Sequence, residues 1–273
     1  MHRTFSTPDA ISLFVAIGSG NVVLHAAPVD QTDVEITGDG ADDVTVEQRG
    51  DEVHVTAPPR LGGLLSGRSG LDVHVSLPSG SRVVTKLGSA DLTATGELGA
   101  VSLKTGTGSV RLESVAGDAE VNTGSGDVTL ANVGRDLRVS SGSGDIELGD
   151  LGGAAQVTTG SGSIQLGAVA AEVLAKTGSG DLRVREASGD AALRTGSGGI
   201  TVDKATRGQL VARTGTGDVR VGIPAGVPVW TDIQSGSGRV HNGLQGVGEP
   251  AEGQEYLELR AKTGSGSVYL EQL

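Results

Sequence analysis

The stretch TGSGDVTLANVGRDLRVS, residues 123–140, decides the fold, because close copies of it recur along the chain. A fixed period is the signature of a repeat architecture, in which each repeat buries its apolar face against its neighbours. Six copies follow one another at intervals of 18 residues, and three more follow at longer intervals. The regular copies begin at Gly106, Gly124, Gly142, Gly160, Gly178 and Gly196, and the later ones at Gly215, Gly236 and Gly264.

Each 18-residue unit holds two short runs in which apolar and polar residues alternate. In the quoted unit the apolar pairs are Val128/Leu130 and Leu137/Val139, and Val133 lies at the bend between them. Alternation of this kind predicts strands with one buried face. Two strands per fixed period predict an all-β protein, a parallel β-solenoid of about ten coils of 18 residues. The general preference of parallel crossovers predicts a right-handed coil.

The glycines of each unit fall where the chain must turn from one coil into the next. Glycine accepts positive φ, and without a Cβ it allows backbone to pack tightly at a corner. We expect either property to explain their presence. The neighbouring hydroxyl residues, such as Thr123 and Ser125, are expected to hydrogen-bond to the backbone of the turn.

The regular period does not extend to the ends of the chain, which we predict to be one continuous domain in three parts. Residues 1–87 have strand-like runs without the 18-residue period and are expected to form an irregular N-terminal β cap with the first coils. Residues 88–221 form the regular solenoid. Residues 222–273 form irregular last coils and a C-terminal cap, in which an insertion at 242–254 precedes a last coil at 257–270.

The composition excludes several classes of function. The formal net charge is −12, which opposes binding to nucleic acid or to an anionic membrane surface. Cysteine is absent, so disulfides and cysteine-based zinc sites are excluded. No apolar run is long enough to insert into a membrane, and AISLFVAIGSG (10–20) fits a first strand better than a signal peptide. We therefore expect a cytoplasmic protein, with a secreted or cell-surface location as the alternative.

The glycine-rich motif has two functional interpretations besides the turn. A phosphate-binding loop needs a helix after the glycines, and no helical periodicity follows any copy. A calcium-binding β-roll is a minor alternative, with Asp127 and Asp145 as ligands, because 18 is twice the nine-residue period of such rolls. Calcium needs several carboxylates, and the equivalent position is Ser163 in one copy and Arg239 in another. The sequence favours aspartates that shape turns, with no metal or cofactor.

The residues do not suggest an enzyme. The five histidines do not cluster in the sequence, and all five lie outside the regular repeat at 88–221. We therefore predict no catalytic residue. The histidines are His2, His25, His54, His74 and His241.

One outward position of the repeat becomes basic toward its C-terminal end, at Lys176, Arg194 and Arg213. If these side chains align, they form a basic column on an acidic protein, and they are the candidate partner-binding residues. The sequence thus predicts a non-enzymatic scaffold or binding protein that holds a macromolecule, most simply a protein, on an exposed face. The alternative is a structural solenoid that dimerises or polymerises. The oligomeric state and the partner are not indicated.

The repeated TGSGDV motif, the opening TFSTPDAISLFVAIGSGNVVL (4–24) and the ending LRAKTGSGSVYL (259–270) resemble a bacterial family of β-solenoid proteins named putative adhesins. This is a domain of unknown function that is common in actinobacteria. The resemblance covers nearly the whole chain. It implies a parallel β-helix and an adhesin-like binding role, and it implies no catalytic residues.

Overall fold

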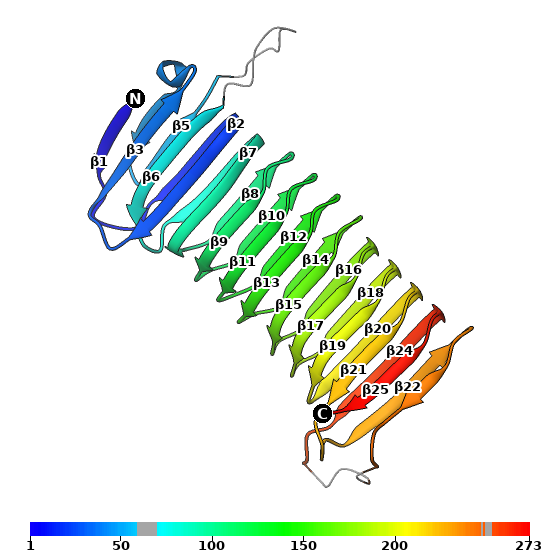
Figure 1. The fold of residues 1–273 in the computed structure, drawn as a ribbon. Coiled ribbons are helices and arrows are strands. Elements are labelled where there is room, and N and C mark those ends of the chain that lie inside the picture. Colours follow the sequence, from blue (N-terminus) through cyan, green and yellow to red (C-terminus); the bar gives the residue numbers. More distant parts are fainter. Residues whose placement is uncertain (59–69, 247, 249–252) are drawn as a thin grey trace, which may run out of the picture. The chain divides into compact units, whose positions relative to one another are not determined.

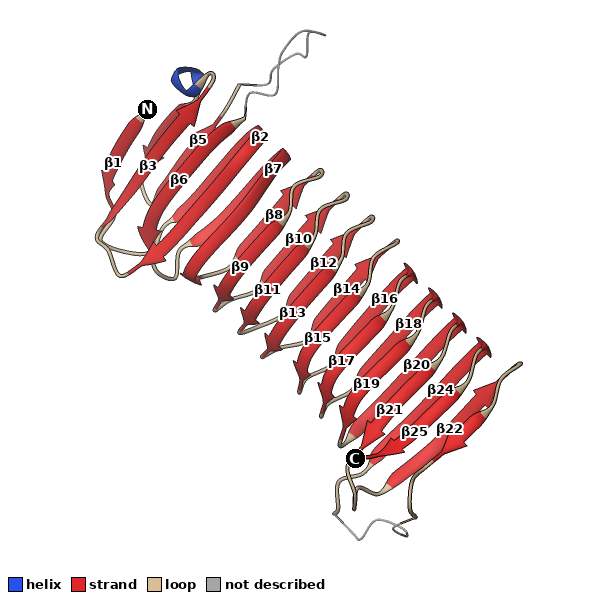
Figure 2. Ribbon diagram, viewed as in Figure 1, coloured by secondary structure: helices blue, strands red, loops and turns tan. Residues whose placement is uncertain are grey.

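A computed structural model describes residues 1–58, 70–246, 248 and 253–273. The fold is built almost wholly of β-strands, as predicted (Figure 2). Within the described ranges the one helix is a short 3₁₀ turn, Ala41–Asp43, and no helix is long and apolar enough to cross a bilayer. The chain divides into two compact units, residues 1–135 and 136–273, and each is described by itself.

Unit 1 begins with a cap in which parallel and antiparallel pairings are mixed (Figure 1). Strand β2 pairs in parallel with β5 and β6 on one side and with β7 on the other. Strands β1 and β6 pair antiparallel with β3, and β4 pairs antiparallel with β5. The expected irregular cap is therefore present. Its strands are β1 (His2–Ser6), β2 (Ser12–Ala27), β3 (Gln31–Gly38), β4 (Thr45–Arg49), β5 (Glu52–Thr56), β6 (Leu71–Pro78) and β7 (Arg82–Leu98).

The rest of unit 1 shows the regular coil, in which each turn of 18 residues gives one strand to each of two parallel sheets. Strand β8 (Val101–Thr105) pairs with β10 (Ala119–Thr123), so that Val101 lies beside Ala119. Strand β9 (Val110–Val115) pairs with β11 (Val128–Val133) in the same register. The inward residues of these strands are buried.

Unit 2 continues the same pattern, with one sheet made of even-numbered strands and the other of odd-numbered strands (Figure 1). The even-numbered strands are β12 (Leu137–Ser141), β14 (Ala155–Thr159), β16 (Val173–Ser179), β18 (Ala191–Ser197), β20 (Gly208–Thr216), β22 (Val229–Ser235) and β24 (Leu257–Ser265). The odd-numbered strands are β13 (Ile146–Leu151), β15 (Ile164–Val169), β17 (Leu182–Ala187), β19 (Ile200–Ala205), β21 (Val219–Ile223), β23 (Val240–Asn242) and β25 (Val268–Gln272).

The core of unit 2 consists of ladders of equivalent aliphatic residues. Ile146, Ile164, Leu182 and Ile200 lie side by side on successive odd-numbered strands and are all buried. The predicted third apolar column is also buried, and in it Val169 lies beside Ala187. Burial of these ladders against one another supplies the hydrophobic stabilisation that a single coil lacks.

The last coil of the sequence is not the last coil of the stack. Strand β24 pairs with β20 on one side and with β22 on the other, and β25 lies in the same way between β21 and β23. Figure 1 shows β24 between β20 and β22. The sequence places coil 257–270 at the end, and this order is wrong for the stack. The insertion that allows the chain to double back, at 242–254, lies partly outside the described residues.

The glycine corners are explained by close backbone packing, and the positive-φ explanation is wrong for most of them. Among the described glycines of the nine repeated corners, only Gly198, Gly217 and Gly266 have positive φ. Each is the second glycine of its copy. A Cβ on Gly178 would lie 2.5 Å from the carbonyl oxygen of Gly160, one coil away. A Cβ on Gly162 would lie closer still to the carbonyl oxygen of Gly144. Each corner therefore leaves no room for a side chain.

A buried threonine fastens one corner to the next in most of the units, as expected from the sequence. The Thr177 hydroxyl donates a 2.8 Å hydrogen bond to the carbonyl oxygen of Gly162, which belongs to the preceding coil. Thr195 bonds to Gly180, and Thr263, in the coil 257–270 that is inserted between two others, bonds to Gly217 of the neighbouring coil. These hydroxyls satisfy carbonyl groups that the core would otherwise leave without a partner.

We expect Gly162→Ala to lower the free energy of unfolding by at least about 2 kcal/mol, because the new Cβ would overlap the Gly144 carbonyl group. Urea unfolding followed by circular dichroism measures the change. The matched control is Gly246→Ala, where a Cβ meets nothing within 4 Å. Equal stability of the two variants would contradict close packing as the reason for the corner glycines.

The same change of threonine to valine should have opposite effects at two buried sites. Thr177→Val removes the hydrogen bond to Gly162 and should cost about 1–3 kcal/mol. Thr85 is 1% exposed, and its hydroxyl has no partner among the residues described. Thr85→Val should therefore raise the free energy of unfolding, because an unsatisfied buried hydroxyl is removed. A loss of stability in both variants would show that the hydroxyl pairing is not what matters.

Candidate functional site

The predicted basic residues are brought together on the outer face of the even-numbered sheet. Lys176 lies beside Arg194, and Arg194 lies beside Arg213, on the neighbouring strands β16, β18 and β20. All three side chains are exposed. Their alignment, expected from the repeat, is therefore present in unit 2.

A fourth cation, Lys262, extends this group and was missed from the sequence. Strand β24 stacks directly on β20, which places Lys262 beside Arg213. We call Lys176, Arg194, Arg213 and Lys262 the basic column. The sequence did contain a signal for the fourth member. Each cation stands immediately before a Thr-Gly pair, as in KTG at 176–178 and at 262–264. The large gap before the last copy concealed that this copy stacks directly on the copy that contains Arg213.

The four cations of the basic column have no acidic partner. None of them forms an ion pair or a side-chain hydrogen bond with any residue that the structure describes. Six other cations in the described part of unit 2 form ion pairs; for example, Arg183 bonds to Asp203 at 3.0 Å, and Lys204 bonds to Glu186 at 2.8 Å. On a chain with net charge −12, a run of unpaired cations is a local exception.

The column next to it carries no negative charge on strands β14 to β24, and its one acidic neighbour there, Asp232 on β22, lies beside Arg260. This column consists of Gln156, Leu174, Ala192, Val211 and Arg260, which lie side by side on successive strands. Leu174 is 36% exposed, an unusual exposure for a large aliphatic side chain on this protein. The outer face therefore joins a basic stripe to a neutral, partly apolar one.

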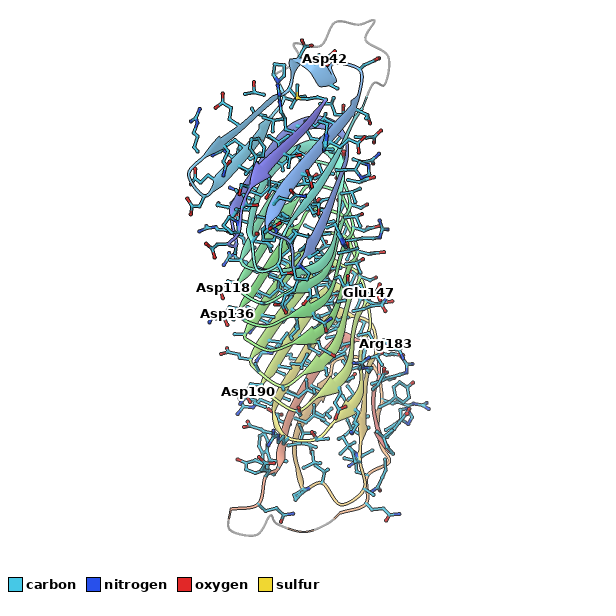
Figure 3. All side chains as sticks on the ribbon, turned by 90° about the vertical axis from the view of Figure 1, so that its left-hand side faces the viewer. Asp42, Asp118, Asp136, Glu147, Arg183 and Asp190 are labelled. Carbon is cyan, nitrogen blue, oxygen red and sulfur yellow. The ribbon has the colours of Figure 1, made fainter. Side chains whose placement is uncertain are left out.

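Acidic residues occur on both sides of unit 2, outside the basic column. Figure 3 shows Asp136 and Asp190 projecting on one side of unit 2, and Glu147 and Arg183 projecting on the opposite side. Asp190 accepts a hydrogen bond from the backbone N–H of Gln209 at 2.8 Å. The edge carboxylates thus contribute to the fold of the corner rather than to the basic column.

Two aromatic side chains lie at the end of the same face. Trp230 is 51% exposed and Tyr256 is 48% exposed, and both line an open cavity of about 440 Å³ together with Glu258 and Arg260. The Arg260 guanidinium lies 5.7 Å from the centre of the Trp230 ring and pairs with Glu258. Exposed aromatic side chains with polar neighbours are typical of binding surfaces.

The aspartates of the repeat bind backbone, which supports the turn interpretation. Asp145 accepts a hydrogen bond from the backbone N–H of Ser163 at 2.8 Å, and Asp181 accepts one from Gly199 at 2.7 Å. Asp127, the other candidate calcium ligand, also has an interaction within the fold. Each such carboxylate ties its corner to the next coil, so the repeated aspartate has a structural role without a cation.

Three histidines that are far apart in the sequence lie on neighbouring strands of the N-terminal cap. His2 and His74 lie on either side of Glu35, and His25 is diagonal to His74. His54 contacts Glu52 at 3.0 Å, His25 contacts Thr95 at 3.0 Å, and the His241 ring stacks on Tyr269 at 4.8 Å. In the part of the chain that the structure describes, no group of three or more His, Cys, Asp or Glu residues could hold a metal ion.

These features define a protein of the parallel β-solenoid class, with extended outer faces and a charged column on one of them. The chain belongs to the Toastrack DUF4097 family, whose profile matches residues 11–174 and, in a second match, residues 120–271. Comparison with curated proteins gives no match.

A solved bacterial structure shares the fold over nearly its whole length, and two others match at lower TM-scores. A putative lipid binding protein from Parabacteroides distasonis is 17% identical, with a TM-score of 0.50; the match covers 100% of this chain and 96% of that one. Putative adhesins from Bacteroides fragilis and Parabacteroides merdae are 12% and 11% identical, with TM-scores of 0.35 and 0.39. Their matches cover 99% and 100% of this chain, and 96% and 95% of those chains.

Asp218 fastens the inserted coil, and its ionisation should be visible in the stability of the protein. The backbone N–H of Ser267 donates to its carboxylate at 2.8 Å, and Arg220 lies beside it. The hydrogen bond from Ser267 has the largest effect, and Arg220 adds to it. Together they hold the pKa of Asp218 below its ordinary value of 3.8. A lowered pKa stabilises the fold at every pH above 3.8, and this contribution is lost as the pH falls below that value.

We therefore expect Asp218→Asn to reduce stability near neutral pH and to differ little from the wild type in acid. Urea unfolding at a series of pH values measures both effects. The control is Asp232→Asn, at an exposed carboxylate on β22. The stability difference between Asp218→Asn and the wild type should shrink as the pH falls. If it does not, the Asp218 charge does not have this role.

Proposed function

We propose that this protein is a non-enzymatic binding module that holds an acidic macromolecule on the basic column. The observation that carries the proposal is the set of four exposed, unpaired cations in register on an otherwise acidic chain. Clustered unpaired cations create a local positive potential that attracts an anionic partner and sets its orientation.

The sheet that carries the column suits an extended partner. Its strands lie about 4.8 Å apart, so the four cations recur at a regular spacing along the stack. Repeat proteins commonly bind through such extended faces. The neutral stripe at Leu174 and Val211 adds apolar contact area beside the charges.

Self-assembly through the coil end is the less favoured function. The terminal coil of unit 2 contains β22. Thr231 takes an inward position of this strand, and Asp232 and Gln234 take outward positions. Polar and charged residues on a terminal strand oppose its pairing with another copy. The adhesin-like role and the cytoplasmic location both stay predictions, and cell fractionation checks the second.

The first test replaces the three predicted cations together, as Lys176→Gln, Arg194→Gln and Arg213→Gln. Immobilised poly-L-glutamate serves as a model acidic polymer, and binding is measured by surface plasmon resonance over a series of salt concentrations. We expect at least about tenfold weaker binding and a shallower salt dependence, by roughly one ion for each cation removed. Stability should change little, because the side chains are exposed.

The matched control removes the same charge from the odd-numbered sheet, as Arg183→Gln, Arg185→Gln and Arg220→Gln. These cations are paired with Asp203, Asp150 and Asp218. We expect the control to bind poly-L-glutamate nearly as the wild type does. Equal weakening in both triple variants would mean that only net charge matters and would contradict a binding role for the basic column.

A further inference from the structure

Each coil of the basic column also carries an exposed hydroxyl group, at the last residue of the strand. Ser179 lies beside Ser197, Ser197 beside Thr216, and Thr216 beside Ser265. Each hydroxyl residue is exposed and follows the cation of its own strand by three residues. Every coil from β16 to β24 thus presents one cation and one hydroxyl at matching positions.

The inserted coil makes this arrangement continuous. Because β24 lies between β20 and β22, Lys262 and Ser265 follow directly on Arg213 and Thr216. Without the insertion, Gln234 of β22 would take the place next to Arg213, and the column would end after three cations. The four coils together span roughly 14 Å along the stack.

We propose that the acidic partner is a polysaccharide that carries a carboxylate on each sugar unit. This inference rests on the proposed function, and it assigns the chemistry of the partner at the same surface. A lysine or arginine side chain pairs with each carboxylate, and the hydroxyl on the same strand exchanges hydrogen bonds with hydroxyl groups of the sugar. The length of one sugar unit in an extended chain is close to the spacing of the coils.

Other acidic polymers fit this spacing less well. In an extended peptide, successive residues advance by about 3.3 Å, which is well below the strand spacing of about 4.8 Å. Along one strand of duplex DNA the phosphates recur at about 3.4 Å, which is well below it. Neither polymer places one charge and one group that can bond to a hydroxyl at each coil.

The aromatic pair at the end of the face also fits a sugar. Arg260 is two residues from Lys262 on β24, and its guanidinium lies over the Trp230 ring. The path from the basic column therefore continues to an aromatic surface that offers a flat apolar platform beside polar groups. The C–H face of a sugar ring matches such a platform.

The experiment uses the full chain and isothermal titration calorimetry with four defined probes. These are the hexamer of galacturonic acid, its fully methyl-esterified form, a hyaluronan hexasaccharide and hexaglutamate. Hyaluronan carries a carboxylate on alternate sugars only, and the methyl ester removes the charge while the sugar chain stays. We expect the galacturonate hexamer to bind at least tenfold more tightly than the hyaluronan or the peptide, and the methyl ester not to bind.

Two variants separate this inference from the proposed function. The hydroxyl variant, Ser197→Ala with Thr216→Val, should weaken galacturonate binding several-fold and leave hexaglutamate binding unchanged. The triple cation variant should weaken both. If hexaglutamate binds as tightly as galacturonate and the hydroxyl variant affects neither, the saccharide assignment is wrong while the proposed function stands. If no acidic probe binds, or the triple cation variant binds as the wild type does, both are wrong.

Discussion

The architecture depends on one close approach, in which the backbone of each glycine corner lies against the corner of the next coil. The space that a Cβ of Gly178 would occupy is taken by the Gly160 carbonyl group. This contact prevents a coil from shifting along its neighbour, because any shift by one residue would bring a side chain into the corner. Threonine hydroxyls and aspartate carboxylates form hydrogen bonds across the same corner. Each bond holds two neighbouring coils at a fixed distance.

A fixed register gives the surface its chemistry as well as its shape. Side chains that are 18 residues apart in the sequence become direct neighbours, so a preference at one position of the repeat becomes a continuous stripe. In the proposed function such a stripe would act collectively, since each cation would contribute little alone and the regular spacing would select the partner. Changes at single positions should therefore weaken binding gradually, in contrast to an active site that one substitution abolishes.

The sequence predicted the coil, the buried columns and the alignment of Lys176 with Arg194, because all of these follow from a constant period. It did not predict the order of the last two coils, since a repeat pattern describes which residues stack but not which copies meet. One physical signal was present. Thr231 occupies the inward position that Leu259 fills on β24, and a coil with a polar inward residue is best placed at the end of the core. The positive-φ expectation failed because extended glycines can also be required by space alone.

The inserted coil has a consequence for how the protein is made. Coils 208–223 and 229–242 leave the ribosome before residues 257–272 that lie between them. The earlier coils can therefore add to the stack one after another during synthesis, whereas coil 229–242 reaches its final neighbour only after residues 257–272 have been made. A chain cut short before Leu257 would lack the coil on which its own terminal coil rests.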